Sequence, residues 1–422
     1  MQAMRIDFGN FRARASGVRG TAGPNRAVAE DLRRFNRGLA LERIFFRGIA
    51  SRNDIARDTG LTGAAISRIT RELLDAGLIR ERQSAGERNG RGRPVTALEL
   101  APNGAFVIGV GIGAYEQWIQ IANHRGECVS RRAVQLLKRK PLARALQTLI
   151  REAHAMVSEA GIPWHRVLGV TVAVAGVVDH ERGNVLYSPN IGWDEAVVAE
   201  PLQRGLKLPV RVEALHHALN LAEARFGATR GAKDVVLVNA ALGIGASVME
   251  AGRIVRGNRA AAGQIGHMRV AGASELCTCG RRGCLDTVAS GYAVLRRLGK
   301  VGSRRIPREH NVDDARRLVD AIEREKCGDA KAQAAFRASG GQLADALNAI
   351  RAVLDPEKIV LAGPLAQTGS YVEGIRSRLD VQGSNSSFLC LATQSSDTAA
   401  VQLALSQFVF CSSLDLARLL DG

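Results

Sequence analysis

Apolar residues recur at every third or fourth position through much of the first hundred residues, which is the spacing of amphipathic helices. They predict one long helix over residues 25–48, on the positions Val28, Leu32, Phe35, Leu39, Leu41, Ile44 and Phe45. Two shorter patterns predict helices over residues 52–59 and 63–76. Ser51 and Asp54 suit a capping-box start for the first of these, and Thr62 suits the N-cap of the second.

The two short helices are joined by a turn at Gly60 and share apolar positions that suit packing around one small core (Ile55, Ala56, Leu61, Ile66, Ile69 and Leu73). This arrangement predicts a helix-turn-helix, in which the second helix enters the major groove of DNA. The residues predicted to face outward are Thr62, Ala64, Ala65, Ser67, Arg68 and Arg71. Arg68 suits a bidentate pair with guanine. The alternative is a small helical hairpin whose arginines are simply solvated.

A strand beginning at Leu78 and a second strand over residues 95–100 predict a wing after the helix pair. The loop between them closes with the segment Gly90-Arg91-Gly92-Arg93-Pro94. Two arginines around one glycine resemble the core of AT-hook peptides, which insert arginines into the narrow minor groove of A·T tracts. The alternative is a basic linker.

After residue 104 the pattern changes to alternating strands and helices. Strands are predicted over residues 106–112, 118–122, 167–178, 234–238 and 359–361. Helices are predicted over residues 141–160, 312–325, 331–354 and 371–379. The periodicity by itself predicts an α/β body with two lobes.

Charge and composition narrow the class of protein. The formal net charge of +17 favours a polyanionic partner, and residues 1–100 contain 19 Arg and no Lys against 11 acidic residues. Residues 1–24 suit a flexible basic arm. The N-terminus lacks the apolar segment of a secretory signal, and the longest apolar run, 167–178, is too short to cross a bilayer. We therefore expect a cytoplasmic protein whose seven cysteines are thiols or metal ligands.

One motif contains four soft metal ligands. His267 is followed by Cys277, Cys279 and Cys284, with Gly280 and Gly283 among the intervening residues. One imidazole and three thiolates complete a closed tetrahedral zinc site, which has no position left for a reacting water. The motif therefore predicts a structural zinc ion. The alternatives are a redox-active thiol cluster and ordinary buried cysteines.

The motifs GQIGH and CTCGRRGCLD, over 263–267 and 277–286, resemble the signature of the ROK family, which unites sugar kinases with sugar-responsive bacterial repressors. The resemblance implies an α/β two-lobed, actin-like or ribonuclease-H-like body with an N-terminal winged helix-turn-helix domain. We expect a basic arm at 1–24 and a DNA-binding domain with its AT-hook-like linker at 25–100. Lobe 1 is expected at 101–225, joined by 400–422, and lobe 2, with the zinc site, at 226–399.

The same resemblance implies that the kinase reaction is lost. Gly111 stands where the family's first phosphate loop has Asp, and Tyr115 stands where it has Thr. Leu215 replaces the catalytic Asp, and Leu cannot accept a proton. His216 and His217 are offset from that position and are poor substitutes. The second phosphate loop, 242–245, keeps its glycines.

A sugar site is only partly preserved. Asn190 lies in a loop that matches the family loop whose Asn binds sugar hydroxyls. Gln264 stands where the family usually has Glu, and Asp286, which also stands in place of Glu, is one methylene shorter. The Asn-Asp pair that contacts sugar in the family is replaced by Ala214 and Leu215. We expect a less polar or modified effector, or none.

Together these features predict a zinc-containing transcriptional repressor without kinase activity. Its expected partners are a pseudo-palindromic double-stranded DNA operator and a sugar-type effector, and we expect a homodimer or homotetramer that does not associate with membranes. The rival functions are a ROK sugar kinase with a DNA-binding appendage, and a regulator controlled by a protein partner.

Overall fold

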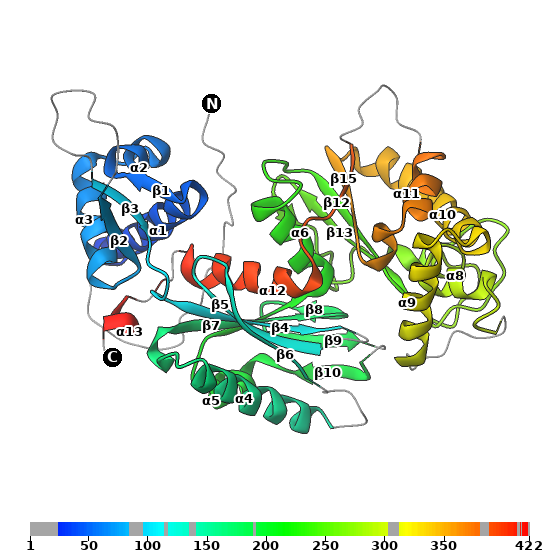
Figure 1. Cartoon of the computed structure of the whole chain (residues 1–422), viewed down its shortest axis with the longest axis horizontal. Helices are drawn as coiled ribbons and strands as arrows, with labels where there is room; N and C mark the ends of the chain where they lie inside the picture. The colour runs from blue at the N-terminus through cyan, green and yellow to red at the C-terminus, as the bar shows by residue number, and fades with distance from the viewer. Residues whose placement is uncertain are drawn as a thin grey trace.

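The computed structural model describes residues 24–83, 96–113, 117–134, 141–188, 191–302, 312–379, 388–411, 414 and 416–420. Its elements form three parts, which Figure 1 shows as a helical unit with a small sheet beside two α/β lobes. No helix in these ranges is long and apolar enough to cross a membrane.

The first part consists of three helices and a three-stranded antiparallel sheet in the order β1-β3-β2. Its elements are α1 (Pro24–Arg47), β1 (Ile49–Ser51), α2 (Arg52–Thr59), α3 (Gly63–Asp75), β2 (Ile79–Gln83) and β3 (Thr96–Leu100). The long helix and both short helices were predicted within one or two residues. The capping box of Ser51 and Asp54 is present, and Gly60 ends α2 in the left-handed conformation with φ 71°.

Lobe 1 contains a five-stranded mixed sheet in the order β11-β7-β4-β5-β6 and a small antiparallel sheet in the order β10-β9-β8. Its strands are β4 (Phe106–Ile112), β5 (Gln117–Asn123), β6 (Cys128–Ala133), β7 (Val167–Val174), β8 (Val177–Asp179), β9 (Asn184–Ser188), β10 (Trp193–Val197) and β11 (Val210–Ala214). Its helices are α4 (Leu142–Glu159), a 3₁₀ turn (Trp164–Arg166) and α5 (Ala199–Leu206). The apolar run predicted as one strand over 167–178 is two strands, because the chain leaves the sheet at Ala175 and Gly176.

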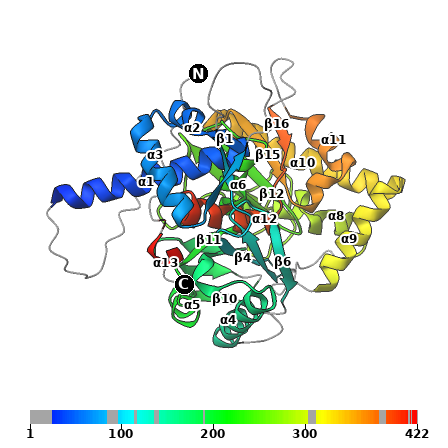
Figure 2. The ribbon, with the colours of Figure 1, turned by 60° about the vertical axis from the view of Figure 1, so that its left-hand side comes forward.

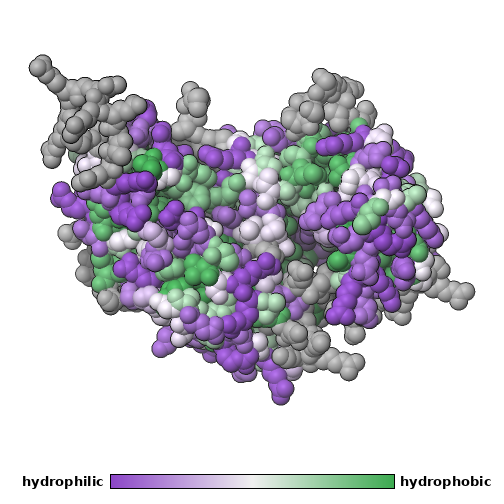
Figure 3. Space-filling model, in the orientation of Figure 1, coloured by the Kyte–Doolittle hydropathy of each residue, from purple (hydrophilic) through white to green (hydrophobic). Residues whose placement is uncertain are grey.

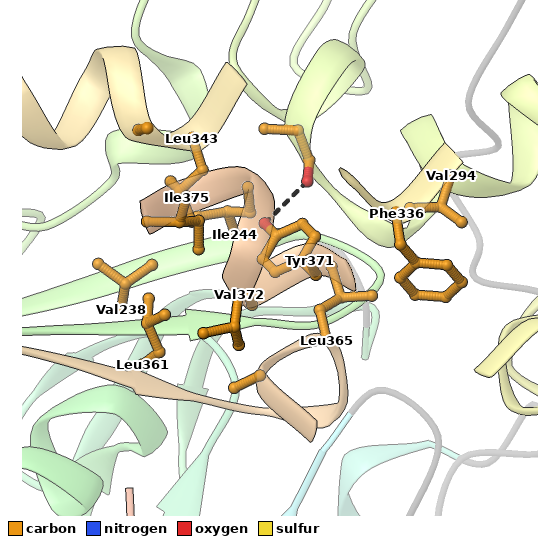
Figure 4. Packing of buried hydrophobic residues seen from close by; sticks show 14 of the residues in the cluster. Val238, Ile244, Val294, Phe336, Leu343, Leu361, Leu365, Tyr371, Val372 and Ile375 are labelled. Carbon is orange, nitrogen blue, oxygen red and sulfur yellow. Dashed lines mark hydrogen bonds between the residues drawn. The ribbon is translucent and has the colours of Figure 1, made fainter. Parts of the chain in front are cut away.

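Lobe 2 contains a second five-stranded sheet, in the order β14-β13-β12-β15-β16. Its strands are β12 (Val235–Ala240), β13 (Ile244–Glu250), β14 (Arg253–Ile254), β15 (Lys358–Ala362) and β16 (Leu389–Leu391). Its helices are α7 (Asp286–Ala289), α8 (Gly291–Arg297), α9 (Val312–Lys326), α10 (Ala330–Leu354) and α11 (Gly369–Arg376), with 3₁₀ turns at Ile265–His267 and Pro364–Gln367. Figure 4 shows its core around Tyr371, whose hydroxyl donates to the carbonyl of Ala289 at 3.0 Å.

Two helices lie between the sheets. They are α6 (Leu215–Phe226), which packs against β12 and β13 of lobe 2, and α12 (Ser396–Ala404), which lies across β4 and β7 of lobe 1. The buried residues shared by these helices and both sheets form one apolar cluster. A π-helical turn (Leu405–Val409) and a short helix α13 (Ala417–Leu420) follow α12.

The N-terminal part is firmly attached to lobe 1. The inner end of α1 shares one buried cluster with the segment that follows α12, and an added Cβ at Gly38 would lie 2.6 Å from the carbonyl oxygen of Cys411. Arg166 of lobe 1 donates to the carbonyls of Ala76 and Gly104, at 2.9 Å each. Figure 2 shows the outer end of α1 projecting away from the body. The helix pair is therefore held at a defined angle on lobe 1.

Candidate functional site

The residues predicted to contact DNA lie along one exposed side of α3. Its first turn is capped by Thr62, whose hydroxyl accepts from the amide of Ala65 at 3.3 Å. The predicted DNA-contacting residues with exposed side chains are Thr62, Ala64, Ser67, Arg68 and Arg71. The opposite face is buried through Ile66, Ile69 and Leu73. Because the apolar face holds the helix in place, the polar face is presented outward as one rigid strip.

Polar contacts fix the angle of α3. Arg52 on α2 donates to the hydroxyl of Thr70 at 3.1 Å and to Glu81 of the wing strand at 2.9 Å. Arg37 on α1 donates to Glu72 at 2.6 Å. These side chains connect α3 to both neighbouring helices and to the wing. The predicted groove-reading arginines Arg91 and Arg93 lie outside the described residues.

The four predicted metal ligands lie together. The ligand atoms of His267, Cys277, Cys279 and Cys284 are all within 4.8 Å of one another. The Sγ atoms of Cys279 and Cys284 are 3.6 Å apart, and His267 Nδ1 is 3.7 Å from Cys277 Sγ. Ligands about 2.3 Å from a tetrahedral zinc ion would be separated by about 3.8 Å. The donor set and its spacing therefore fit a four-coordinate ion.

The cluster also has the electrostatics of a metal site. Burial and the neighbouring Cys277 together raise the pKa of Cys284 to about 12. Three thiolates this close together need a compensating cation, which a divalent ion supplies. Gly280 and Gly283 adopt φ of 85° and 71°, which lets the chain turn back so that Cys279 and Cys284 converge.

The cluster adjoins one wall of a large cleft between the lobes. The cleft has a volume of about 830 Å³, and the residues that line it include Gln264, His267 and Asp286. Asp286 accepts from the amide of Ile244 at 2.7 Å, and burial raises its pKa to about 7. Figure 3 shows the notch that separates the two lobes on one face of the molecule. Gln264 and Asp286 are thus brought together at the cleft, whereas the predicted ligand residue Asn190 lies outside the described residues.

Ring side chains lie directly against two glycines that line the cleft, Gly111 and Gly245. Gly111 on β4 pairs with Trp118 on β5, and an added Cβ at Gly111 would overlap the indole ring. Across the cleft, an added Cβ at Gly245 would lie 2.7 Å from Cε1 of His216. We did not predict either contact. The Gly111–Trp118 pair follows from the predicted hairpin once its register is known, whereas the contact between Gly245 and His216 depends on how α6 packs against β13.

An ion pair with a buried carboxylate also joins the lobes beside the cleft. Arg256 of lobe 2 donates to both carboxylate oxygens of Glu213 on β11, at 2.8 and 2.7 Å. His217 Nδ1 lies 3.1 Å from the same carboxylate. Burial alone would raise the pKa of Glu213, but the bonds from His217 and Arg256 lower it to about 2. Glu213 therefore stays charged and is satisfied by Arg256, and the sequence pattern had no signal for this pair.

Comparison with known proteins places these features in a family. The sequence model of the ROK family matches residues 107–406. The chain is 28% identical to the xylose repressor of Caldicellulosiruptor bescii, over 63% of this chain and 66% of that repressor, just under two thirds of its length. It is 26% identical to the DNA-binding transcriptional repressor Mlc of Escherichia coli, over 81% of this chain and 84% of that protein.

Solved structures show the same fold. A ROK family transcriptional regulator, described as a homolog of the E. coli MLC protein, superposes with a TM-score of 0.71 at 24% identity, over 93% of this chain and 100% of the other. A ROK family glucokinase from Streptomyces griseus, solved with glucose and AMPPNP, superposes with a TM-score of 0.58 at 26% identity. It covers 72% of this chain and 100% of its own. The match to the regulator, unlike that to the kinase, extends over nearly the whole chain.

Proposed function

The chain belongs to the ROK family, and on that premise we propose that it is a DNA-binding transcriptional repressor that responds to a sugar-type effector and has no kinase activity. The observation that carries this proposal is the combination of an outward-facing α3, attached rigidly to lobe 1, with a cleft whose phosphate positions are filled by Trp118 and His216. The names of the similar repressors support the same function.

DNA recognition is assigned to α3. In this proposal Arg68 pairs with a guanine edge, and Thr62, Ala64, Ser67 and Arg71 contact neighbouring bases and phosphates. Arg91 and Arg93 are proposed to enter the adjacent minor groove. Replacing both arginines should weaken binding most at operator sites with A·T-rich flanks. An equal loss of affinity on every DNA would show that the segment contributes only positive charge.

The loss of kinase activity rests on three positions. Gly111 carries no carboxylate to orient a metal and a phosphate, and the indole of Trp118 occupies the space where such a side chain would lie. Leu215 has no group that accepts the proton of a sugar hydroxyl. ATP-dependent turnover of a hexose by the purified protein, abolished by changes in the cleft, would instead establish the rival kinase.

We assign a structural zinc ion to His267, Cys277, Cys279 and Cys284. Bound there, the ion would supply the positive charge for three thiolates and fix the turn at His267. That turn directly follows Gln264, and the Cys284 end of the loop leads into Asp286. The proposed role of the ion is therefore to hold two cleft residues in place.

The proposed partners follow from this arrangement. A homodimer or homotetramer presents pairs of α3 helices to a pseudo-palindromic operator. Occupation of the cleft would change the relation between the lobes, and so the spacing of the paired helix units. Because its target is chromosomal DNA, we expect the protein in the cytoplasm.

The first experiment is to sequence the genomic fragments that the purified protein retains at near-physiological salt. Salt matters because a chain with a net charge of +17 holds any DNA when ions are dilute. A few fragments sharing a palindrome with A·T-rich flanks are the expected result. If the recovered fragments share no motif and their retention is lost as the salt concentration rises, the protein is not a sequence-specific regulator. A specific operator that no sugar releases would favour control by a protein partner.

A further inference from the structure

The cleft contains almost no fixed charge. Among the described residues that line it, Asp286 is the sole carboxylate, and none is Lys or Arg. This is unusual in a chain with 58 basic and 41 acidic residues. A phosphate or carboxylate entering the cleft would lose its hydration without meeting a side-chain cation, which is a large uncompensated cost.

The start of α6, which opens on the cleft, has a carboxylate directly beside it. The carboxylate of Glu213 accepts from the amide of Ala214 at the start of the helix, at 2.9 Å. The nearby guanidinium of Arg256 is held by the same carboxylate on both of its oxygens. This arginine is therefore already paired and is not available to an anionic ligand.

The cleft wall does contain neutral hydrogen-bonding groups. His216 Nδ1 and His217 Nε2 are buried and have no hydrogen-bond partner among the described residues, and both residues line the cleft. Burial lowers the pKa of His216 to about 4, so its imidazole is neutral near pH 7. A neutral imidazole can donate a hydrogen bond to a hydroxyl group and accept one from it. Buried polar atoms such as these two normally have hydrogen-bond partners.

The lobe 1 side of the same cleft is apolar. The apolar side chains that line it there include Trp118, Ala175, Val177, Leu215 and Leu219. In the family, an acidic residue would stand at the position of Leu215 and another at the position of Gly111. We call this surface, defined by these five residues, the apolar floor. It suits a ligand group that is hydrophobic and contains no charge.

These observations assign a ligand class, and the assignment rests on the proposed sugar response. We infer that the effector is an uncharged glycoside, a sugar without phosphate or carboxylate, whose apolar aglycone lies on the floor formed by Trp118 and Leu215 while its hydroxyls reach His216 and His217. The apolar floor thus selects for the aglycone, and the imidazoles of His216 and His217 select for the sugar hydroxyls.

The test is calorimetric titration of the full-length protein with matched forms of three sugars. D-xylose, D-glucose and N-acetylglucosamine are each offered as the free sugar, the phenyl β-glycoside and the 1-phosphate, so that only the substituent at one carbon changes. Burial of the phenyl ring should make at least one phenyl glycoside bind roughly tenfold tighter than its free sugar. No 1-phosphate should bind measurably.

Release of the operator is measured on the same samples, which separates this inference from the proposed function. A sugar phosphate that binds tighter than its parent sugar and releases the operator would overturn the uncharged-glycoside assignment and leave the sugar response standing. Free sugars that bind as tightly as their phenyl glycosides would overturn the role of the apolar floor. If no form of any sugar binds, both the assignment and the sugar response fail, whatever the operator affinity.

Variants of Leu215 make the test sharper. Leu215→Lys places a cation on the floor and should create binding of a 1-phosphate while removing the preference for the phenyl glycoside. Leu221→Lys, a half-buried position on the same helix that does not line the cleft, is the matched control and should leave the selectivity unchanged. Leu215→Ser is the milder variant should the lysine prevent folding, and it should narrow the difference between phenyl glycoside and free sugar. Unchanged selectivity in Leu215→Ser would place the aglycone elsewhere.

Discussion

The helix pair and the cleft differ in how far apart in the sequence their parts lie. The caps, the turn and the apolar face that form α2 and α3 all lie within residues 51–75: a cap at Ser51, a left-handed Gly60, a second cap at Thr62 and the buried side of α3. The cleft, in contrast, is lined by segments between Gly111 and Ser396. The surface proposed to face DNA is therefore a local product of sequence, whereas the surface proposed to face the effector depends on tertiary packing.

The two regions also use charge differently. Side chains on α3 such as Arg68 and Arg71 are exposed and suit an anionic partner. In the cleft, Glu213 and Arg256 satisfy each other and the remaining lining is nearly neutral. A protein with a high net positive charge thus concentrates its interaction with anions outside the cleft. This contrast implies that changes in the two regions should alter different properties, and each prediction below tests that separation.

The largest expected effect is in the cleft wall. Cys279→Ser removes one thiolate from the proposed zinc site, where structural zinc contributes roughly 10 kcal/mol of apparent binding free energy. The bound zinc measured by atomic absorption should fall from one ion per chain towards none, and the thermal midpoint should fall with it. Cys327→Ser, at an exposed cysteine outside the cluster, is the control and should change neither quantity. An unchanged zinc content in Cys279→Ser would show that this cluster does not bind the metal.

The second effect lies where the helix unit meets lobe 1. His124 is fully buried there, with Nε2 donating to the carbonyl of Leu78 at 2.8 Å and Nδ1 accepting from the amide of Ala105 at 3.3 Å. The neutral ring satisfies both partners, so a second proton has no acceptor. Burial accordingly lowers the pKa of His124 from 6.5 to about 4.

Because the folded state disfavours the proton, the stabilisation is complete above pH 6.5 and is lost as the pH falls towards 4. The loss should reach about 3 kcal/mol, measured as the free energy of unfolding in urea at several pH values. His124→Phe should be less stable at pH 7 but should lose this part of the pH dependence. An identical pH dependence in the variant and in the original chain would show that other groups cause it.

The sequence predicted more of the helix unit than of the cleft. Helix bounds, both caps and the buried face of α3 followed from periodicity and from residues within two turns of each other. The family fold was also predicted correctly, because the spacing of His267 and the three cysteines is itself a local signal. The filling of the space beside these two glycines was not predicted, since it requires the register of Gly111 against Trp118 and the packing of His216 on α6 against Gly245 on β13.

A third prediction tests that packing directly. Gly111→Ala forces the indole of Trp118 to move, and overpacking of this kind costs about 1–3 kcal/mol. Gly243→Ala is the matched control in the second loop, because its added Cβ would have no neighbour closer than 3.7 Å. Urea unfolding of the two variants should therefore differ clearly. Equal stabilities would mean that the indole does not fill the space beside Gly111.

The last prediction concerns α3 and has the smallest effect on the molecule as a whole. Arg68→Ala should weaken operator binding by roughly 1–3 kcal/mol and relax the preference at one base position, because a bidentate contact with guanine discriminates among bases. Arg34→Ala, an exposed arginine on α1, is the control and should lower affinity for all DNA only slightly. The free energy of unfolding should be unchanged in both, since neither side chain is buried. Binding measured on a set of single-base operator variants distinguishes the outcomes: a uniform loss on every variant would assign Arg68 to a phosphate, and base recognition would then have to lie elsewhere on α3.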